Sequence, residues 1–254
     1  MLVSDLVTGA SSGLGQFLAR QLGATAGTRE SLPEILSGGR GFDRIIHCAS
    51  VSRFDSSLSE LTESNIELTD RLLNVSHKRF VFISTIDVYP DRPGNRFDED
   101  FELPDDLNSY RSAYAWSKAM AEKLVLNRAQ KPLVLRPTAL LDSSYKKLGT
   151  ALKIVTNQKV RIAKGSVADC VPYRLLYEII QHSSQPMGIY NVASSKAYPI
   201  EQASEDFAFT AGYGEYLYRT PEADVTKLQS LLGRGLATTK AYLDEYQNGL
   251  LESR

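Results

Sequence analysis

With 254 residues, 43% hydrophobic and 23% charged, the chain is long enough for one large globular domain, or a domain with a small extra lobe. Its net charge of −1 argues against a nucleic-acid-binding surface, which would be basic. The two cysteines, Cys48 and Cys170, give no disulfide framework and favour a reducing, cytoplasmic location.

Other classes of protein are also disfavoured. Residues 1–8 are too short and too weakly charged for a signal peptide. No apolar run approaches the roughly 20 residues of a membrane span. The three histidines, His47, His77 and His182, are scattered, so the sequence predicts no metal site.

Residues 2–8 predict a short buried strand, which leads through a glycine-rich turn into a helix over Gly13–Leu22. This order is the context of a dinucleotide-binding fingerprint. Glycines let the backbone approach a pyrophosphate, and the helix N-terminus faces its charge. The simpler interpretation is a tight turn, but we favour phosphate binding. The predicted cofactor-binding residues here are Gly9, Ser11, Ser12, Gly13, Leu14 and Gly15.

The predicted second strand, residues 24–28, ends in Thr28 and Arg29. An acidic residue at this tip typically bonds the ribose of NAD, whereas an arginine can hold the 2′-phosphate of NADP. No Asp stands at the tip, and Glu30 comes one or two places late. We therefore expect Thr28 and Arg29 to bind the cofactor, with NADP preferred to NAD. The alternative is that Arg29 is an ordinary solvated charge.

Strands and helices then alternate along the chain. Residues 31–41 predict a loop where a full doubly wound unit would place another strand, and residues 91–109 predict a polar loop. The predicted strands are 43–49, 80–83 and 133–135, and the predicted helices are 59–77 and 114–129. This alternation predicts a parallel sheet covered on both sides.

Past Leu141 the pattern loosens. Helices are predicted over 146–156, 171–181, 200–211, 222–232 and 238–247, and a last strand over Gly188–Val192. The predicted fold class is α/β, a Rossmann-type doubly wound parallel sheet with a small C-terminal lobe. Residues 1–141 form the dinucleotide-binding domain, 171–193 return to it, and 142–170 with 194–254 form the lobe.

Tyr114 and Lys118 lie four residues apart on a predicted helix, so their side chains share one face. A cation near the phenol lowers its pKa of about 10. Reaching neutrality takes about 3 units, or about 4 kcal/mol, so one lysine needs help such as a cationic nicotinamide ring. The plain alternative is a surface tyrosine and lysine on an ordinary helix.

Together these motifs give the chain a family resemblance. It resembles the extended short-chain dehydrogenases/reductases of the NAD-dependent epimerase/dehydratase type, which act on nucleotide sugars. The segments that carry the resemblance are Gly9–Gly15, Ile45-Ile46-His47-Cys48-Ala49, Asn65, Ser84-Thr85-x-x-Val88-Tyr89, Tyr114-x-x-x-Lys118, Leu135-Arg136-Pro137, Gly188-Ile189-Tyr190-Asn191-Val192 and Asp224-x-x-Lys227.

The resemblance implies a role for individual residues. Tyr114 matches the catalytic acid/base, and Lys118 matches the residue that bonds the nicotinamide ribose and lowers the tyrosine pKa. Thr85 matches the hydroxyl that bonds the substrate oxygen, although it could merely satisfy a turn. The resemblance also places Ala49 and Pro137 beside the cofactor.

Two supporting roles follow in the same way. Asn65 is expected to bond backbone near the site, and His47 to support the cofactor and backbone. The implied reaction is hydride transfer to or from the nicotinamide, coupled to proton transfer by Tyr114.

Three features depart from the family pattern. The glycine spacing is closer to that of the compact branch of the superfamily, with Ser12 at the usual middle glycine and Gly13 after it. The usual adenine-contacting Asp after the third strand is not evident. Residues 169–174 lack the paired Asp common in this region, so a nucleotide-sugar substrate rests on analogy.

Asp87 bears on the type of reaction. The family's sugar dehydratases place Asp-Glu directly after the catalytic threonine, whereas this chain has Ile86 and Asp87 after Thr85. The apolar Ile86 disfavours dehydration, and Asp87 could serve as a second proton-transfer group in epimerisation or reduction. Alternatively, Asp87 caps the turn before Pro90.

The partners expected from the resemblance are a sugar or sugar nucleotide and a second copy of the chain. The homodimer would pair the 59–77 and 114–129 helices in a four-helix interface. Alternatively, the apolar faces of these helices only cover the sheet. The alternative function is a non-catalytic NAD(P) sensor or partner-binding module.

Overall fold

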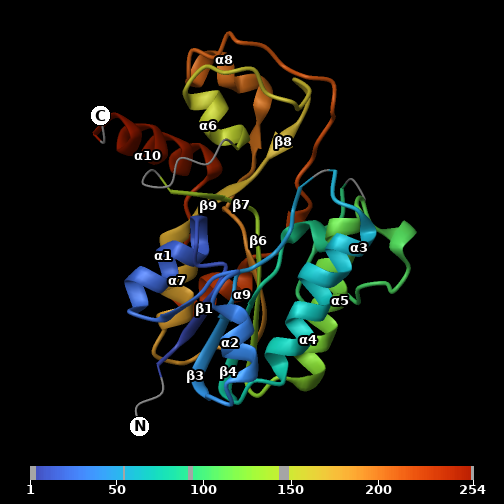
Figure 1. Ribbon diagram of the computed structural model, residues 1–254. Coiled ribbons are helices and arrows are strands. Elements are labelled where there is room, and N and C mark those ends of the chain that lie inside the picture. The colour runs from blue at the N-terminus through green and yellow to red at the C-terminus, as the bar shows by residue number, and fades with distance from the viewer. Residues whose placement is uncertain (1–3, 54, 91–93, 143–148, 253–254) are drawn as a thin grey trace.

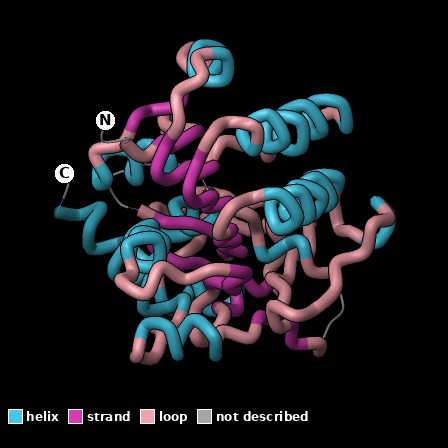
Figure 2. Tube along the Cα trace, turned by 90° about the horizontal axis from the view of Figure 1, so that it is seen from below, coloured by secondary structure: helices cyan, strands magenta, loops and turns pink. Residues whose placement is uncertain are grey.

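A six-stranded parallel sheet forms the centre of the molecule (Figures 1 and 2). The computed structural model describes residues 4–53, 55–90, 94–142 and 149–252. The strand order is β2-β1-β3-β4-β6-β10. Their bounds are Thr25–Gly27, Leu6–Thr8, Phe42–His47, His77–Ile83, Pro132–Pro137 and Gly188–Val192, respectively. The predicted Rossmann-type sheet is confirmed, and residues 2 and 3 of the first predicted strand lie outside the described residues.

Side chains of the central strands alternate between two hydrophobic cores. In β4, Phe80 and Phe82 face one core, and Val81 and Ile83 face the other. Successive residues of a strand point to opposite faces, so a continuous apolar run indicates a sheet buried on both sides. The same alternation holds in β1, β3 and β6.

Helices cover both faces of the sheet. On one face lie α1 (Gly13–Leu22) and α7 (Tyr173–Gln181), which share a core with Val81. On the other lie α4 (Leu68–Leu73) and α5 (Ala113–Arg128), which pack against Phe80. Figure 1 shows α3, α4 and α5 together on the side away from α1 and α7.

The loop predicted at residues 31–41 is wrong in part, because it contains the helix α2 (Leu32–Ser37). Pro33 is compatible with a helix here because it lies in the first turn, where its missing N–H has no helical partner. Leu32, Ile35 and Leu36 then pack against the sheet. The described residues between β2 and β3 contain no strand, as the sequence indicated.

The helix predicted at 59–77 is shorter and changes type within its length. It consists of α3 (Leu58–Leu61), the π-helix η1 (Thr62–Glu67) and α4, and His77 already belongs to β4. A capping box between Ser57 and Glu60 begins the run. π-Helical turns are rare and concentrate at functional sites, and this one contains the buried Asn65.

Most of residues 150–172 and 198–220 lie in the upper part of Figure 1, whereas residues 226–232 pack against strand β10 of the central sheet. Among the described residues, three small two-stranded sheets lie outside the central sheet. The strands pair as β5 with β12, β7 with β9 and β8 with β11. Their bounds are Arg96–Phe97, Glu222–Ala223, Ala139–Leu141, Cys170–Pro172, Val167–Ala168 and Tyr198–Pro199, respectively. The helices are α6 (Thr150–Val155), α8 (Ala203–Asp206), α9 (Thr226–Leu232) and α10 (Thr239–Glu252), with 3₁₀ turns at Ile86–Val88, Leu107–Ser109 and Ile200–Gln202.

Several predicted C-terminal helices are therefore too long. The 200–211 prediction contains only a 3₁₀ turn and α8, and strands β9 and β12 occupy the starts of the 171–181 and 222–232 predictions. Residues 146–148 of the 146–156 prediction lie outside the described part of the chain. Short paired strands escape a periodicity argument because two or three residues define no period. The domain boundary at residue 141 stays a prediction.

A buried ion pair joins the sheet to α5 beneath the site. Arg136 of β6 and Glu122 of α5 have side chains only 2% and 1% exposed, and Arg136 Nη2 lies 2.7 Å from Glu122 Oε2. Ser84, at the end of β4, donates a hydrogen bond to the same carboxylate. Arg136 Nη1 donates to the Tyr89 hydroxyl over 2.7 Å, and that hydroxyl donates to Asn191 Oδ1 of β10 over 2.8 Å. The network therefore fixes α5, β4, β6 and β10 relative to one another.

We predict that Arg136→Met lowers the free energy of unfolding by about 3–5 kcal/mol, because it leaves the Glu122 carboxylate buried and unpaired. The double variant Arg136→Met/Glu122→Leu should be more stable than this single variant. Urea denaturation measures both. Arg128→Met is the control, because its ion pair with Asp70 is exposed and should contribute about 1 kcal/mol or less. Equal stability losses at Arg136 and Arg128 would contradict the prediction.

Candidate active site

A cavity of about 890 Å³ opens at the carboxyl ends of the parallel strands. Ligands of doubly wound α/β proteins bind at this edge of the sheet. Every predicted cofactor-binding residue lines the cavity: Gly9, Ser11, Ser12, Gly13, Leu14, Gly15, Thr28, Arg29, Ala49 and Pro137. Three of the four predicted catalytic residues line it too, namely Thr85, Asp87 and Tyr114.

The glycine turn between β1 and α1 is shaped by close backbone contacts. A Cβ on Gly9 would come within 2.9 Å of the Ala49 nitrogen, and Gly9 has a φ of +68°. A Cβ on Gly15 would lie 2.3 Å from the Gly9 carbonyl oxygen. Both positions therefore require glycine, whereas Ser12 between them is tolerated.

The N-terminus of α1 can receive a phosphate. Ser12 stands at the N-cap position in extended conformation, yet its side chain makes no capping hydrogen bond. The first N–H groups of a helix have no partners within the helix and carry partial positive charge. A dinucleotide pyrophosphate fits this turn, because the glycines admit its close approach and Gly13, Leu14 and Gly15 of the first helical turn line the cavity.

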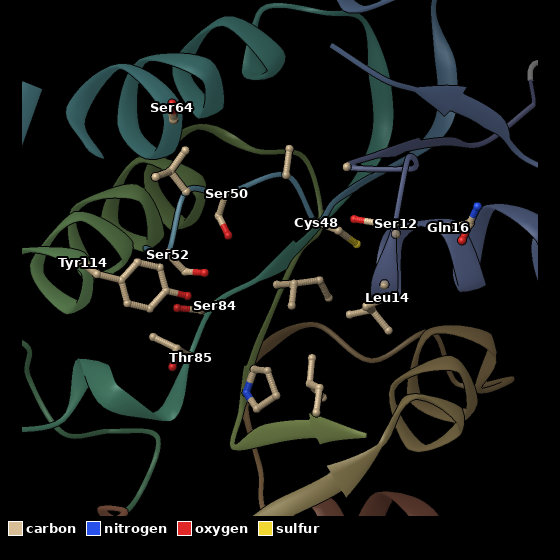
Figure 3. A pocket seen from close by; sticks show the side chains of 18 of the residues that line it. Ser12, Leu14, Gln16, Cys48, Ser50, Ser52, Ser64, Ser84, Thr85 and Tyr114 are labelled. Carbon is tan, nitrogen blue, oxygen red and sulfur yellow. The ribbon is translucent and has the colours of Figure 1, made fainter. Parts of the chain in front are cut away.

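Tyr114 lies at the start of α5, which Ser112 caps by accepting a hydrogen bond from the Ala115 nitrogen over 3.2 Å. Figure 3 shows Tyr114, Ser50, Ser84 and Thr85 at one side of the cavity and Ser12 and Leu14 at the other. Burial raises the pKa of the Tyr114 phenol, the Asp87 charge raises it further, and a hydrogen bond with Ser50 lowers it. The residues of the chain alone therefore keep the phenol protonated at neutral pH.

Lys118 lies behind the cavity wall and not on its surface. It is 1% exposed, and its Nζ lies 4.0 Å from the centre of the Phe82 ring. Burial lowers the pKa of Lys118 to about 7, while the Glu122 charge acts in the opposite direction. The expected lowering of the Tyr114 pKa by Lys118 does not arise from the chain itself, because the effects that act on the phenol are burial, Asp87 and Ser50.

A chain of buried hydrogen bonds connects the glycine turn to α5. His47 Nδ1 lies 2.7 Å from Thr8 Oγ1, and its Nε2 lies 3.0 Å from Thr69 Oγ1. The Thr69 hydroxyl donates to the Asn65 carbonyl over 2.6 Å, so it can only accept from His47. Nε2 is therefore the protonated nitrogen. Burial, with a contribution from the Lys118 charge, lowers the pKa of His47 to about 3 and keeps the ring neutral.

Asn65 connects these hydrogen bonds to α5. Its side chain accepts from the Val51 nitrogen over 2.8 Å and donates to the Val51 carbonyl over 3.0 Å. It also lies 2.9 Å from Ser117 Oγ, which in turn donates to the Tyr114 carbonyl over 2.8 Å. The expected role of Asn65 in bonding backbone near the site is confirmed. The π-helical turn η1 places it there.

The tip of β2 presents Thr28 and Arg29 to the cavity. The Thr28 nitrogen donates a hydrogen bond to Ser31 Oγ over 2.9 Å, and this bond closes a tight turn before α2. A hydrogen bond with Thr28 lowers the pKa of the fully exposed Glu30. Arg29 is therefore the charged residue at this tip that lines the cavity.

Several further polar residues line the cavity without any sequence signal that marks them, among them Ser50, Tyr173 and Tyr218. Ser50 follows β3, and Tyr173 begins α7. Tyr218 comes from the C-terminal part of the chain and donates a hydrogen bond to Asp87 Oδ1 over 3.0 Å. The Asp87 side chain thus contacts Tyr218, while the Asp87 backbone nitrogen donates to Thr85 Oγ1.

Comparison with known proteins adds the family. A family model described as Male sterility protein matches residues 37–179, more than half of the chain. The chain belongs to this family, within the extended short-chain dehydrogenases/reductases. A search of the curated proteins finds no match.

Several solved structures share the fold of this chain. MoeE5, in complex with UDP-glucuronic acid and NAD, is 18% identical with a TM-score of 0.80, covering 99% of this chain and 100% of its own. UDP-glucuronic acid 4-epimerase from Bacillus cereus is 15% identical, with a TM-score of 0.73 and coverage of 98% and 99%. dTDP-glucose 4,6-dehydratase from Bacillus anthracis is 17% identical, with a TM-score of 0.75 and coverage of 98% and 97%.

Within residues 4–53, 55–90, 94–142 and 149–252, no group of three or more His, Cys, Asp or Glu side chains could hold a metal ion. In the same described ranges, every helix is too short or too polar to cross a membrane.

Proposed function

We propose that the protein is an NAD(P)-dependent oxidoreductase or epimerase that acts on a sugar or nucleotide sugar. The observation that carries this proposal is the single cavity that joins the Gly9–Gly15 turn to Thr85 and Tyr114. A dinucleotide with its pyrophosphate on this turn would extend toward Tyr114. MoeE5, which has a similar structure, is seen in complex with NAD and either UDP-glucuronic acid or UDP-glucose. The similar dTDP-glucose 4,6-dehydratase is seen in complex with NAD. These neighbours support the choice of substrate class.

The residues of the chain divide the chemistry between them. A bound nicotinamide supplies or accepts the hydride. The Thr85 hydroxyl bonds the substrate oxygen, and Tyr114 takes or returns the proton of that oxygen. Lys118 is assigned to the nicotinamide ribose by the family resemblance, and this role requires its side chain, which is 1% exposed and does not line the cavity, to reach the surface when the cofactor binds. The phenol needs the positive charge of the oxidised cofactor as well as Lys118 to lose its proton near neutrality, because the chain alone raises its pKa.

Asp87 is the second proton-transfer group. Its carboxylate lines the cavity and acts electrostatically on Tyr114. Hydride removal makes the proton on the neighbouring carbon more acidic, and a carboxylate can remove it. Ile86, which is buried and apolar, stands where the dehydratases have an acid. The chain is therefore proposed to epimerise or reduce its substrate and not to dehydrate it.

We predict that Tyr114→Phe abolishes turnover of a sugar-nucleotide panel (UDP-glucose, UDP-galactose, UDP-glucuronic acid and dTDP-glucose) while nicotinamide affinity changes by about twofold or less. The ring still packs, but the proton carrier is lost, which costs roughly 10²–10⁴-fold in rate. Lys118→Ala should reduce both turnover and cofactor binding. Product analysis by mass spectrometry and cofactor titration by fluorescence measure the two effects. Turnover by Tyr114→Phe at the wild-type rate would contradict the mechanism.

NADP is the proposed cofactor, with NAD as the alternative. Arg29 lines the cavity at the tip of β2, and its planar guanidinium suits the oxygens of a 2′-phosphate. Glu30, the nearby acid, is fully exposed.

We predict that Arg29→Ala weakens NADP binding by about tenfold and leaves NAD binding nearly unchanged, because only NADP carries the phosphate that Arg29 would contact. Isothermal titration of both cofactors measures the ratio. Arg20→Ala is a control, since Arg20 lies in the last turn of α1, away from the cavity wall. An unchanged NADP/NAD ratio in Arg29→Ala would rule out the assignment.

The proposed assembly is a homodimer. Its proposed location is the cytoplasm, which follows from the cysteine content. The run α3–η1–α4 packs beside α5, and an ion pair between Asp70 and Arg128 links α4 to α5. Leu58 and Leu126 remain 46% and 37% exposed on these helices. The inward faces already cover the sheet through Leu72 and Val125. The exposed apolar residues therefore support a second contact on the outward side.

We predict a particle of twice 28.1 kDa in light scattering at micromolar concentration. Leu126→Glu should shift it toward the monomer, because it would bury a charge in the proposed interface. Met187→Glu, at a 55% exposed position between α7 and β10, should have no effect. A 28.1 kDa particle for the wild-type protein would contradict the dimer.

A further inference from the structure

A tyrosine from the C-terminal lobe forms part of the cavity wall beside Asp87. Tyr218 lies between two isolated β-bridges, Ile162 with Tyr216 and Val167 with Arg219. Its backbone nitrogen donates to Ser166 Oγ over 3.0 Å, and its carbonyl accepts from the Val167 nitrogen over 2.9 Å. The lobe therefore holds the Tyr218 backbone firmly on both sides.

The Tyr218 side chain contacts the Asp87 carboxylate directly. Its hydroxyl donates to Asp87 Oδ1 over 3.0 Å, and Arg111 Nη1 lies 3.9 Å from the same oxygen. The Arg111 guanidinium stacks 5.1 Å from the centre of the Tyr218 ring. Arg111 Nη2 also donates to the Arg219 carbonyl over 2.9 Å. Tyr218, Arg111 and Asp87 thus form one cluster across the two parts of the chain.

The cluster adjoins the groups assigned to the chemistry. Asp87 follows Thr85 by two residues, and its backbone nitrogen donates to Thr85 Oγ1 over 3.3 Å. Asp87, Thr85, Tyr114 and Tyr218 all line the same cavity. A carboxylate has several rotamers and two oxygens, so a donor on one oxygen fixes the direction of the other.

We propose that Tyr218 is a positioning residue, whose hydrogen bond orients the Asp87 carboxylate and favours its ionised form. The catalytic meaning of this arrangement rests on the proposed function, in which Asp87 is the second proton-transfer group. The site is then complete only when the C-terminal lobe is docked on the sheet domain, because Asp87 and Tyr218 come from different parts of the chain.

The direction of the pH effect follows from the groups around Asp87. Loss of solvation raises the pKa of the carboxyl, while hydrogen bonds from Tyr218 and Thr85 and the charge of Arg111 lower it. The Asp87 charge in turn raises the pKa of the Tyr114 phenol. Removing the Tyr218 hydroxyl removes a donor to the charged form, so the pKa of Asp87 must rise.

The test is the titration of Asp87 by ¹³C NMR in protein labelled at the aspartate carboxyl carbons, with Asp87→Asn identifying the resonance. We expect Tyr218→Phe to raise the Asp87 midpoint by roughly one pH unit. The matched control is Tyr216→Phe, because Tyr216 is two residues away, 48% exposed and outside the cavity wall. An Asp87 midpoint in Tyr218→Phe equal to that in Tyr216→Phe would overturn the inference.

A second measurement does not depend on the folding of Tyr218→Phe. In Tyr114→Phe protein labelled at the tyrosine Cζ carbons, which lacks the other tyrosine that senses the Asp87 charge, one ring resonance should follow the Asp87 titration, and it should stop doing so when Asp87→Asn is added. Tyrosine resonances that are all insensitive to the protonation of Asp87 would also overturn the inference.

Activity separates this inference from the proposed function. With a sugar nucleotide that the wild-type protein turns over, Tyr218→Phe should lower kcat by about tenfold and shift the acid limb of the pH profile upward, with cofactor affinity unchanged. A wild-type protein that binds neither NAD nor NADP would contradict the proposed function and leave the NMR result intact. An unmoved Asp87 titration would contradict the role of Tyr218 even in an active enzyme.

Discussion

The buried pair of Glu122 and Arg136 is the constraint on which the site depends. It joins the middle of α5 to β6, and through Ser84 and Tyr89 it reaches the end of β4 and strand β10. A charge this deeply buried is stable only with its partner in place, so α5 has one allowed position against the sheet. That position sets where Tyr114, two turns earlier on the same helix, enters the cavity beside Thr85.

A second series of buried hydrogen bonds fixes α5 from the side of the glycine turn. It runs from Thr8 through the neutral His47 and Thr69 to Asn65, and from there to Val51 and Ser117. The loop after β3 and the first turn of α5 are thus tied to the strand that carries the glycine turn. Satisfied polar networks of this kind rigidify a core. The two networks together explain how the residues proposed to bind phosphate and to transfer a proton, which are far apart in sequence, share one cavity.

Sequence reasoning reaches those features whose causes are local. Gly9 and Gly15 are required by one turn, and the spacing of Tyr114 and Lys118 belongs to one helix. It reaches further only through the family resemblance: Asn65 is assigned in that way, although its side-chain partners lie 14 and 52 residues away. It misses Tyr218, which meets Asp87 across 131 residues. It also fails for α2, because Pro33 signals a break except in the first turn of a helix. The effect of Lys118 on Tyr114 depends on a bound cofactor, which no property of the chain alone supplies.

Hydride transfer in this cavity can be followed by rapid mixing of the NADP⁺- or NAD⁺-loaded protein with each sugar nucleotide of the panel, with the absorbance of the reduced nicotinamide as the signal. We expect a transient or lasting rise in that absorbance with at least one substrate, slower when deuterium replaces hydrogen at the reacting carbon. Firm binding of both cofactors with no reduction by any sugar nucleotide would contradict this expectation.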